Sequence, residues 1–322
     1  MPRKLFLISI FLLPFSFLLS GCCFNCLISR SELSGQKDLE QQNHRATEIW
    51  AGNIDSVITS EYGGNLQSFT VDEVSPMIKL PGYYNSDLLL SCDSGRLIDV
   101  QDVQLYDSER KAVVKMASTL TESGFKMEKG YRMNLDTGDI YISKIIINET
   151  PSLKNIEALQ QIVLCKGGFL LVPVNVSSEY PDGYEFKGLD AKTQAHVDSP
   201  RVDRIANKIV CQVTDNLSGL ILNTDSTEGW FGYFYKDTLL LVRYSPFYTS
   251  LEKKKAIVFQ AEMTKDAIIC AFGQTFRNLP EKNSSIKIYE KIALIKLKSE
   301  INSIEDINKA LKYLKVNLIV RR

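Results

Sequence analysis

A tight turn between two alternating segments is the sequence feature that most constrains the fold. Apolar and polar residues alternate from Phe125 to Leu135 and again from Ile140 to Ile147, as in strands that bury one face. Asp136-Thr137-Gly138-Asp139 lies between them, and the glycine permits the positive backbone angle that such a turn requires. The sequence therefore predicts an antiparallel hairpin over these residues.

Segments with helical spacing flank this hairpin on both sides. The first predicted helix follows Ser108 and ends at Gly124, and the second follows Pro151 and ends at Gly167. Their inward faces carry apolar residues at helical spacing: Val113, Met116, Ala117, Leu120, Ile156, Leu159 and Val163. With strands before and after, residues 96–176 are predicted to form a ferredoxin-like βαββαβ unit, with both helices on one face of the sheet.

The second half of the chain is rich in predicted strands. Short apolar segments recur between Ile205 and Phe272, and Lys236-Asp237 is predicted to turn one tight hairpin. A helix is predicted from Ser303, which can cap its first turn, with Ile304, Ile307, Leu311 and Leu314 facing inward. The predicted fold class is therefore α+β: a ferredoxin-like unit followed by a strand-rich antiparallel domain with a C-terminal helix.

An aromatic cluster occupies Trp230 to Tyr235, where both faces of the predicted strand are apolar. One interpretation is an aromatic platform for a sugar or a peptide. The other is a strand that is covered on both sides within a β core. The second interpretation is favoured, because a filled core explains the apolar residues on both faces.

The amino-terminal segment has the features of a secretory signal. Arg3 and Lys4 precede an uncharged apolar run from Leu5 to Leu19, which ends in Leu19-Ser20-Gly21-Cys22. This tetrapeptide resembles the lipobox of bacterial lipoproteins. The resemblance implies that Cys22 is acylated, for example with palmitate, and becomes the first residue of the mature protein. An uncleaved membrane anchor is the alternative, because the apolar run is nearly long enough to span a bilayer.

The lipoprotein resemblance sets the predicted domain boundaries and location. Residues 1–21 form the signal peptide, 22–48 a flexible tether, 49–180 the α+β domain and 200–322 the β-rich domain. Cys23 follows the lipidated cysteine, and by the resemblance this favours the outer membrane of the bacterial cell envelope. The folded part would face the periplasm or the cell surface, attached to the membrane by acyl chains.

Four cysteines lie in the predicted folded part, namely Cys92, Cys165, Cys211 and Cys270. An oxidising compartment permits disulfides. If each bridge stays within one predicted domain, Cys92 pairs with Cys165 and Cys211 pairs with Cys270. Buried unpaired thiols remain the alternative, because connectivity cannot be derived from spacing.

The sequence contains few candidates for catalysis. Lys and Arg number 38 and Asp and Glu number 38, so bulk charge does not predict a nucleic-acid partner. His44 and His196 are the only histidines, and no metal site or cofactor is predicted. Asp93-Ser94-Gly95 and Asp136-Thr137-Gly138 match the short motif of aspartic proteases, but they lie too close together for two lobes.

The function predicted from these observations is a lipid-anchored, non-enzymatic binding or assembly module with a protein partner in the envelope. The alternative is an extracytoplasmic hydrolase that uses carboxylates. A deep pocket with two converging carboxylates would favour the hydrolase. An exposed sheet edge or a flat apolar patch would favour the binding module.

The lipobox generates the first testable prediction. Replacing Cys22 with Ala is expected to release the protein from membranes or to block its processing, because the acyl chains would have no attachment site. Mass spectrometry of the mature amino terminus measures this directly. Recovery of peptides from residues 5–19 in the mature protein, or of an unlipidated Cys22, would favour the uncleaved anchor.

Overall fold

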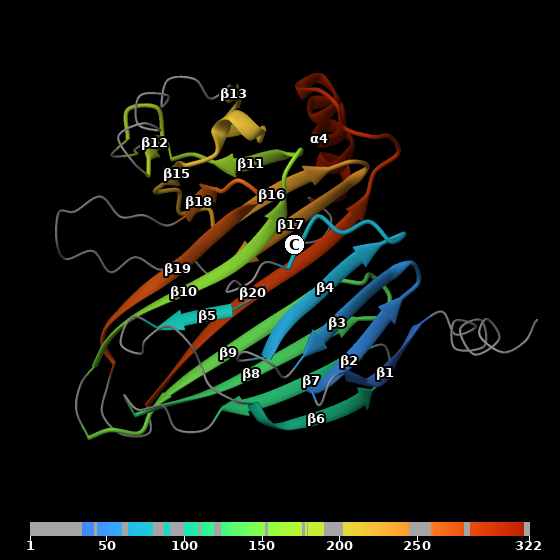
Figure 1. Ribbon diagram of the computed structural model, residues 1–322, viewed down its shortest axis with the longest axis vertical. Helices are drawn as coiled ribbons and strands as arrows, with labels where there is room; N and C mark the ends of the chain where they lie inside the picture. The colour runs from blue at the N-terminus through green and yellow to red at the C-terminus, as the bar shows by residue number, and fades with distance from the viewer. Residues whose placement is uncertain are drawn as a thin grey trace, which may run out of the picture.

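Antiparallel β-sheets make up most of the described structure. A computed structural model describes residues 34–41, 44–59, 64–79, 87–90, 100–108, 111–118, 124–151, 154–175, 178, 180–189, 202–244, 259–279 and 284–318. Within these ranges the strands form three sheets, of ten, six and four strands, and neighbouring strands pair antiparallel throughout. Figure 1 shows the long strands of the largest sheet crossing the whole molecule diagonally.

The ten-stranded sheet combines strands from both halves of the chain. In spatial order it contains β13 (Val202–Ile205), β14 (Lys208–Gln212), β11 (Phe169–Pro173), β16 (Trp230–Tyr235), β17 (Thr238–Tyr244), β20 (Ser284–Lys296), β9 (Ile140–Asn148), β8 (Phe125–Asn134), β7 (Lys111–Ser118) and β6 (Val100–Ser108). The strand nearest the C-terminus, β20, therefore lies in the middle of the sheet.

Two smaller sheets complete the fold. The six-stranded sheet contains β12 (Glu185–Gly188), β15 (Leu220–Thr224), β18 (Phe259–Met263), β19 (Ala267–Leu279), β10 (Lys154–Cys165) and β5 (Asp87–Leu90). The four-stranded sheet contains β1 (Ser34–Gln41), β2 (His44–Ala51), β3 (Ile54–Thr59) and β4 (Asn65–Val71). The remaining regular elements of the described residues are a 3-10 turn, η1 (Asp215–Leu217), and one helix, α4 (Ile304–Leu318).

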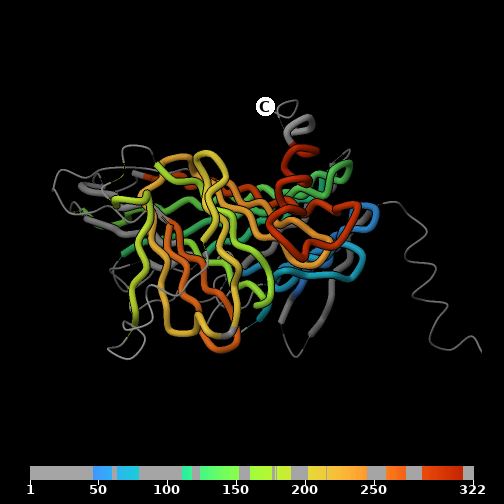
Figure 2. Tube along the Cα trace, turned by 90° about the horizontal axis from the view of Figure 1, so that it is seen from above, coloured from blue at the N-terminus to red at the C-terminus, as the bar shows by residue number. Residues whose placement is uncertain are grey.

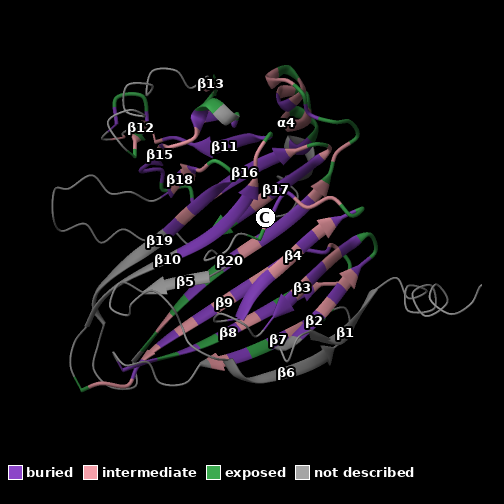
Figure 3. Cartoon of the chain, viewed as in Figure 1, coloured by how far each residue is buried: buried purple, intermediate pink, exposed green. Residues whose placement is uncertain are grey.

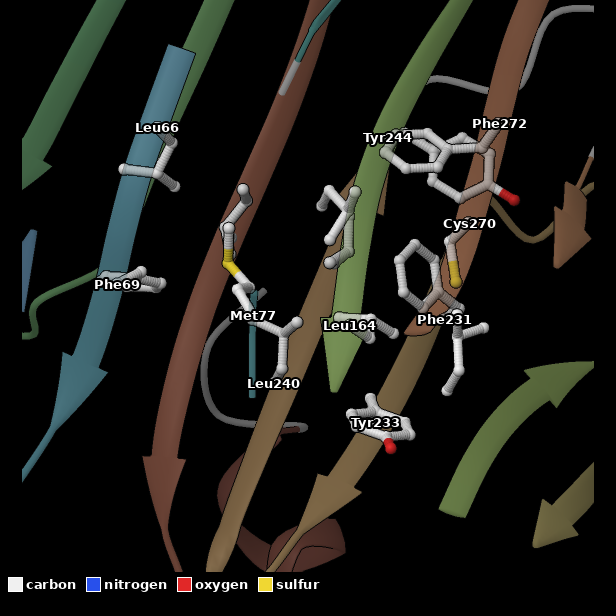
Figure 4. Packing of buried hydrophobic residues seen from close by; sticks show 14 of the residues in the cluster. Leu66, Phe69, Met77, Leu164, Phe231, Tyr233, Leu240, Tyr244, Cys270 and Phe272 are labelled. Carbon is white, nitrogen blue, oxygen red and sulfur yellow. The ribbon is translucent and has the colours of Figure 1, made fainter. Parts of the chain in front are cut away.

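The main core lies between the ten-stranded sheet and the two smaller sheets. One apolar cluster joins buried residues of all three sheets, and Figure 4 shows part of it. Phe231 on β16 contacts Phe259 and Phe272 of the six-stranded sheet, with ring centroids 4.9 and 5.5 Å apart. On the other side, the hydroxyl of Tyr131 on β8 donates a 2.8 Å hydrogen bond to the carbonyl of Gly64, just before β4. We call this side of the ten-stranded sheet the inner face.

The described residues cover only part of the opposite side, which we call the outer face. Helix α4 packs there against β11, β14, β16 and β17, with Ile307 and Leu314 buried against Phe234 and Leu239. Figure 2 shows α4, in red, on one side of the molecule and the turns of the six-stranded sheet on the other. Over β7, β8, β9 and β20 the outer face carries intermediate and exposed side chains, which alternate with buried ones along each strand (Figure 3).

Several predicted elements are confirmed. The hairpin of β8 and β9 turns at residues 134–139, where the Gly138 amide donates to the Asn134 carbonyl at 2.7 Å and Gly138 has a φ of 69°. Helix α4 begins beside Ser303, whose hydroxyl accepts a 3.2 Å hydrogen bond from the Asp306 amide. The tight hairpin at Lys236 also forms, since Tyr235 pairs with Thr238.

The ferredoxin-like unit is wrong, because both of its helices are strands. Residues 111–118 form β7, in which Ala112, Val114 and Met116 are buried in alternation. The second predicted helix is β10, which pairs with β19 over most of its length and also with β5. Both segments satisfy helical and strand periodicity locally, and pairing with distant strands decides between them. The fold is therefore mostly antiparallel β and not α+β with a βαββαβ core.

The predicted domain boundaries also differ from the strand pairing. Residues 49–180 and 200–322 contribute strands to the same sheets, with β9 paired to β20 and β10 paired to β19. The first described strand, β1, lies within the predicted tether at 22–48, where it pairs with β2, and β2 pairs with β3. The polar sequence of β1 conceals this edge strand, since an edge strand needs few apolar residues.

A buried polar cluster crosses the main core between two sheets. Lys144 of β9 donates hydrogen bonds to Glu290 of β20 at 3.1 Å and to Gln160 of β10 at 2.8 Å. The side chains of Lys144 and Glu290 have no solvent exposure. A buried pair of this kind contributes little net stability. The loss of one partner, however, leaves the other charge buried and unpaired in an apolar environment.

This cluster generates a stability prediction. Lys144→Met or Glu290→Leu alone is expected to lower the free energy of unfolding by about 3 to 5 kcal/mol, because each leaves one buried charge without its partner. The double variant is expected to recover most of that loss. Denaturant unfolding of all four proteins measures both effects. Additive losses in the double variant would contradict the predicted dependence of each charge on the other.

Candidate functional site

A row of long side chains crosses the open part of the outer face. Directly paired residues on five successive strands, from β16 to β8, form the row: Trp230, Arg243, Lys291, Tyr141 and Arg132. Facing residues on paired strands have Cβ atoms about 5 Å apart, so neighbouring side chains in this row are within contact distance. The register of the sheet thus places two aromatic and three cationic side chains side by side.

A second row of paired residues lies two positions away from the first on β20, β9 and β8, and it continues onto β7. The side chains at its centre are small. It runs through Tyr289, Ser143, Gly130 and Lys115, again as directly paired residues. Ser143 and Gly130 are small, and a Cβ at Gly130 would lie 2.8 Å from the Ser143 hydroxyl. The centre of this row therefore forms a floor, with Tyr289 at one end and Lys115 at the other.

The two rows enclose a pocket of about 510 Å³ on the outer face. An adjoining hollow of about 370 Å³ shares Lys115, Gly130 and Ser143 with it and continues toward Ala117 and Glu128. Together they form an elongated depression, which we call the outer trough. The volume of the pocket is in the range of small-molecule sites, and the shared floor leaves room for a ligand longer than one ring.

The ring of Tyr141 is held between two cations. The Arg132 guanidinium lies 4.9 Å from its centroid and the Lys291 ammonium 5.0 Å. Lys291 also forms a 2.6 Å ion pair with Asp139, at the end of the β8–β9 turn. Burial alone would lower the pKa of Lys291, but its hydrogen bonds to Asp139 and Tyr141 outweigh this, so the pKa is raised. Lys291 therefore carries its charge throughout the physiological pH range.

Tyr289 is the most accessible aromatic side chain of the outer trough. It is 53% exposed and stands at the wall of the pocket, on the central strand of the sheet. Large aromatic side chains bury much surface when a ligand covers them, and their hydroxyls supply a polar contact. Tyr289 is therefore available to a ligand without any rearrangement of the core.

The sequence-based interpretation of Trp230 to Tyr235 is largely confirmed. Phe231, Tyr233 and Phe234 are buried, so the segment is a covered strand of the β core. Trp230 is half-buried and continues the row of long side chains beside Arg243. Its indole N–H donates a 2.9 Å hydrogen bond to Glu228, outside the pocket lining.

None of the other sequence-predicted candidate residues that the structure describes lines this site. Cys22, Cys92, Asp93 and His196 lie outside the described residues. Asp136 is exposed in the β8–β9 turn, as its hairpin interpretation predicts. In the described part of the chain, no group of three His, Cys, Asp or Glu side chains is arranged to hold a metal ion. No helix among the described residues is long and apolar enough to cross a membrane.

The predicted disulfide between Cys211 and Cys270 is not formed in the structure. Both are buried free thiols in the main core, and the half-buried Cys165 is also a free thiol. Burial raises the pKa of all three thiols, that of Cys211 to about 12. The predicted partner of Cys165, Cys92, lies outside the described residues.

These thiols generate a chemical prediction. At pH 8 native Cys211 and Cys270 are expected to resist iodoacetamide, because burial suppresses the reactive thiolate. After denaturation without a reductant, both are expected to become carbamidomethylated, which peptide mass spectrometry detects. A Cys211–Cys270 linked peptide would instead restore the disulfide prediction.

Comparisons with known proteins identify the fold. No protein family and no curated protein sequence matches the chain. Solved structures do, and one is a candidate aldose 1-epimerase from Klebsiella pneumoniae with 8% identity, a TM-score of 0.54, and coverage of 82% of this chain and 83% of the other. A galactose mutarotase-like protein from Lactobacillus casei has 11% identity, a TM-score of 0.50, and coverage of 81% and 100%.

A third similar structure belongs to a larger protein. It is a TPR-domain containing protein from Parabacteroides distasonis, with 8% identity and a TM-score of 0.52. The match covers 81% of this chain and 50% of that protein, so the chain spans about half its length. At these identities the three similarities show the fold alone, which is a galactose mutarotase-like β-sandwich.

This fold corrects the expectation of a non-enzymatic module. The chain has an enzyme-like fold, shared with a candidate aldose 1-epimerase and a mutarotase-like protein. The carboxylate pair expected for a hydrolase is also missing from the described lining of the pocket. Glu290 is the one acidic residue of that lining, and its carboxylate lies buried on the inner face beside Lys144.

Proposed function

We propose that this protein binds a carbohydrate in the outer trough and belongs functionally with mutarotase-like proteins. The observation that carries the proposal is the pair of cross-strand rows, which place Tyr141 and Tyr289 around a floor of Ser143 and Gly130. The similar structures are named for reactions of aldose sugars, which supports a sugar as the ligand.

The chemistry of the trough suits a sugar. A sugar ring has an apolar C–H face and a rim of hydroxyls, so it requires an aromatic surface beside hydrogen-bonding groups. The exposed ring of Tyr289 offers the surface, and Ser143, Arg132 and Arg243 offer hydrogen-bonding groups at the pocket wall. Lys291 is a weak acid at neutral pH because its pKa is raised, which suits it to hydrogen bonding more than to proton transfer.

We also propose that the protein works in the bacterial envelope, attached through a lipid on Cys22 and in contact with a protein partner there. The lipobox resemblance supports this location, with the outer membrane favoured by Cys23. A sugar-binding trough on a membrane-attached protein would meet carbohydrates outside the cytoplasm.

Sugar binding by the full-length protein in detergent tests the proposed function. Tyr289→Ala is expected to weaken glycan binding about tenfold, because the ligand loses its aromatic surface. Tyr313→Ala is the matched control, since Tyr313 on α4 is 54% exposed and lies outside the trough. Calorimetry with glycans selected on an array provides the affinities, and polarimetry of the same sugars measures anomer interconversion.

Equal affinities for the Tyr289→Ala and Tyr313→Ala variants would contradict the placement of the site. The absence of any glycan that binds, together with unchanged rates of anomer interconversion, would contradict the proposed function itself.

A further inference from the structure

We infer that the ligand of the outer trough is an anionic carbohydrate, bearing carboxylate or sulfate groups. The inference rests on the proposed function and specifies the class of sugar. Its basis is the imbalance of charge around the pocket. The described lining includes four cationic residues, Lys115, Arg132, Arg243 and Lys291, whereas the carboxylate of its one acidic residue, Glu290, is fully buried on the inner face.

The two arginines of this group are not neutralised by the described carboxylates. Asp139 pairs with Lys291, and its side chain is only 8% exposed. Among the described residues, no carboxylate forms an ion pair with Arg132 or Arg243, although both side chains are exposed. The adjoining hollow adds one exposed carboxylate, that of Glu128, at its far end. The pocket itself therefore keeps a clear excess of positive charge.

The arrangement of these cations destabilises the free protein. Arg243 and Lys291 are directly opposite each other on β17 and β20, and like charges in such pairs are destabilising. Lys291 and Arg132 also approach the same ring from two sides. An anion bound over this row would reduce the repulsion between the cations. Anionic ligands would therefore bind more tightly than neutral ones.

The type of cation indicates the type of anion. Guanidinium groups present a planar set of N–H donors that matches the two oxygens of a carboxylate or sulfate. Arg132 and Arg243 lie on opposite sides of Lys291 and Tyr141 in the same row. A chain of acidic sugar units could thus place one anionic group near each arginine, while the aromatic rings contact the sugar faces.

A matched set of ligands tests the inference. Trigalacturonate, its fully methyl-esterified form and a sulfated galactose trisaccharide are titrated into the full-length protein at 50 and 300 mM NaCl. The acid is expected to bind at least about tenfold more tightly than the ester at low salt, and added salt is expected to reduce this preference. The sulfated sugar shows whether the site prefers a sulfate or a carboxylate group. Tighter binding of either anionic sugar than of the neutral ester supports the inference.

Variants locate the effect. Arg132→Gln and Arg243→Gln are each expected to weaken binding of the acid about tenfold and to leave binding of the ester almost unchanged. Arg204→Gln removes the same charge from an exposed arginine outside the trough and is expected to change neither affinity. Equal losses in the three variants would overturn the placement of the anion beside the row.

The outcomes separate the two proposals. If the ester binds as tightly as the acid, the inferred charge preference is wrong and the proposed function stands. If a neutral glycan binds but none of the acidic sugars does, the inference alone is wrong; both proposals fail only if no glycan binds and the rate of anomer interconversion is unchanged. Binding of anionic lipid vesicles or of an oligonucleotide, without binding of any acidic sugar, would also overturn the inference and assign the cationic row to another class of partner.

Discussion

The pairing of β20 with both β17 and β9 is the constraint on which the rest of the structure depends. This one strand joins the earlier strands β6 to β9 to the later strands β16 and β17, and so makes one sheet from two parts of the chain. It also fixes the site, because Lys291 has Arg243 on one side and Tyr141 on the other. A register shift of one residue would exchange the two faces of β20 and remove Tyr289 and Lys291 from the trough.

The polar cluster in the core acts on the same register. Glu290 occupies β20 between Tyr289 and Lys291, and it reaches Lys144 only in the observed pairing of β20 with β9. In a shifted register, its carboxylate would leave Lys144 buried without an anion, which is far more costly than the intact pair. The buried contact on the inner face of β20 thus favours the strand register that positions Tyr289 and Lys291 on the outer face. The third member, Gln160, extends the same network to the six-stranded sheet.

Local sequence patterns predict the parts of this fold that depend on neighbouring residues. The β8–β9 hairpin and the cap of α4 at Ser303 follow from turn and capping chemistry within a few positions. The two wrong helices lie in segments where distant pairing decides. Residues 111–118 offer apolar spacings of two and of three or four, and only β6 and β8 on either side select the strand.

The candidate site likewise contains residues placed by local sequence and residues placed by the pairing of distant strands. Arg132 lies four residues before the predicted turn at 136–139 and Tyr141 two residues after it, so the predicted hairpin places them on one face but not directly opposite each other. The observed turn at residues 134–139 pairs them directly. The contributions of Arg243 and Tyr289 depend on the pairing of β20 with β17 and β9, which no local pattern reveals. The predicted Cys211–Cys270 disulfide is wrong for a related reason, because both cysteines fill a shared core as apolar side chains.

The position of β20 also has a consequence for folding kinetics. Until residues 284–296 are available, β9 and β17 each have an unpaired edge, and unpaired edges recruit other chains. The contacts that close the sheet join segments far apart in the sequence, which slows folding. A nascent chain is therefore prone to aggregate until nearly all of it has been synthesised. The strand order of this fold thus leaves two sheet edges exposed until the last strand is made.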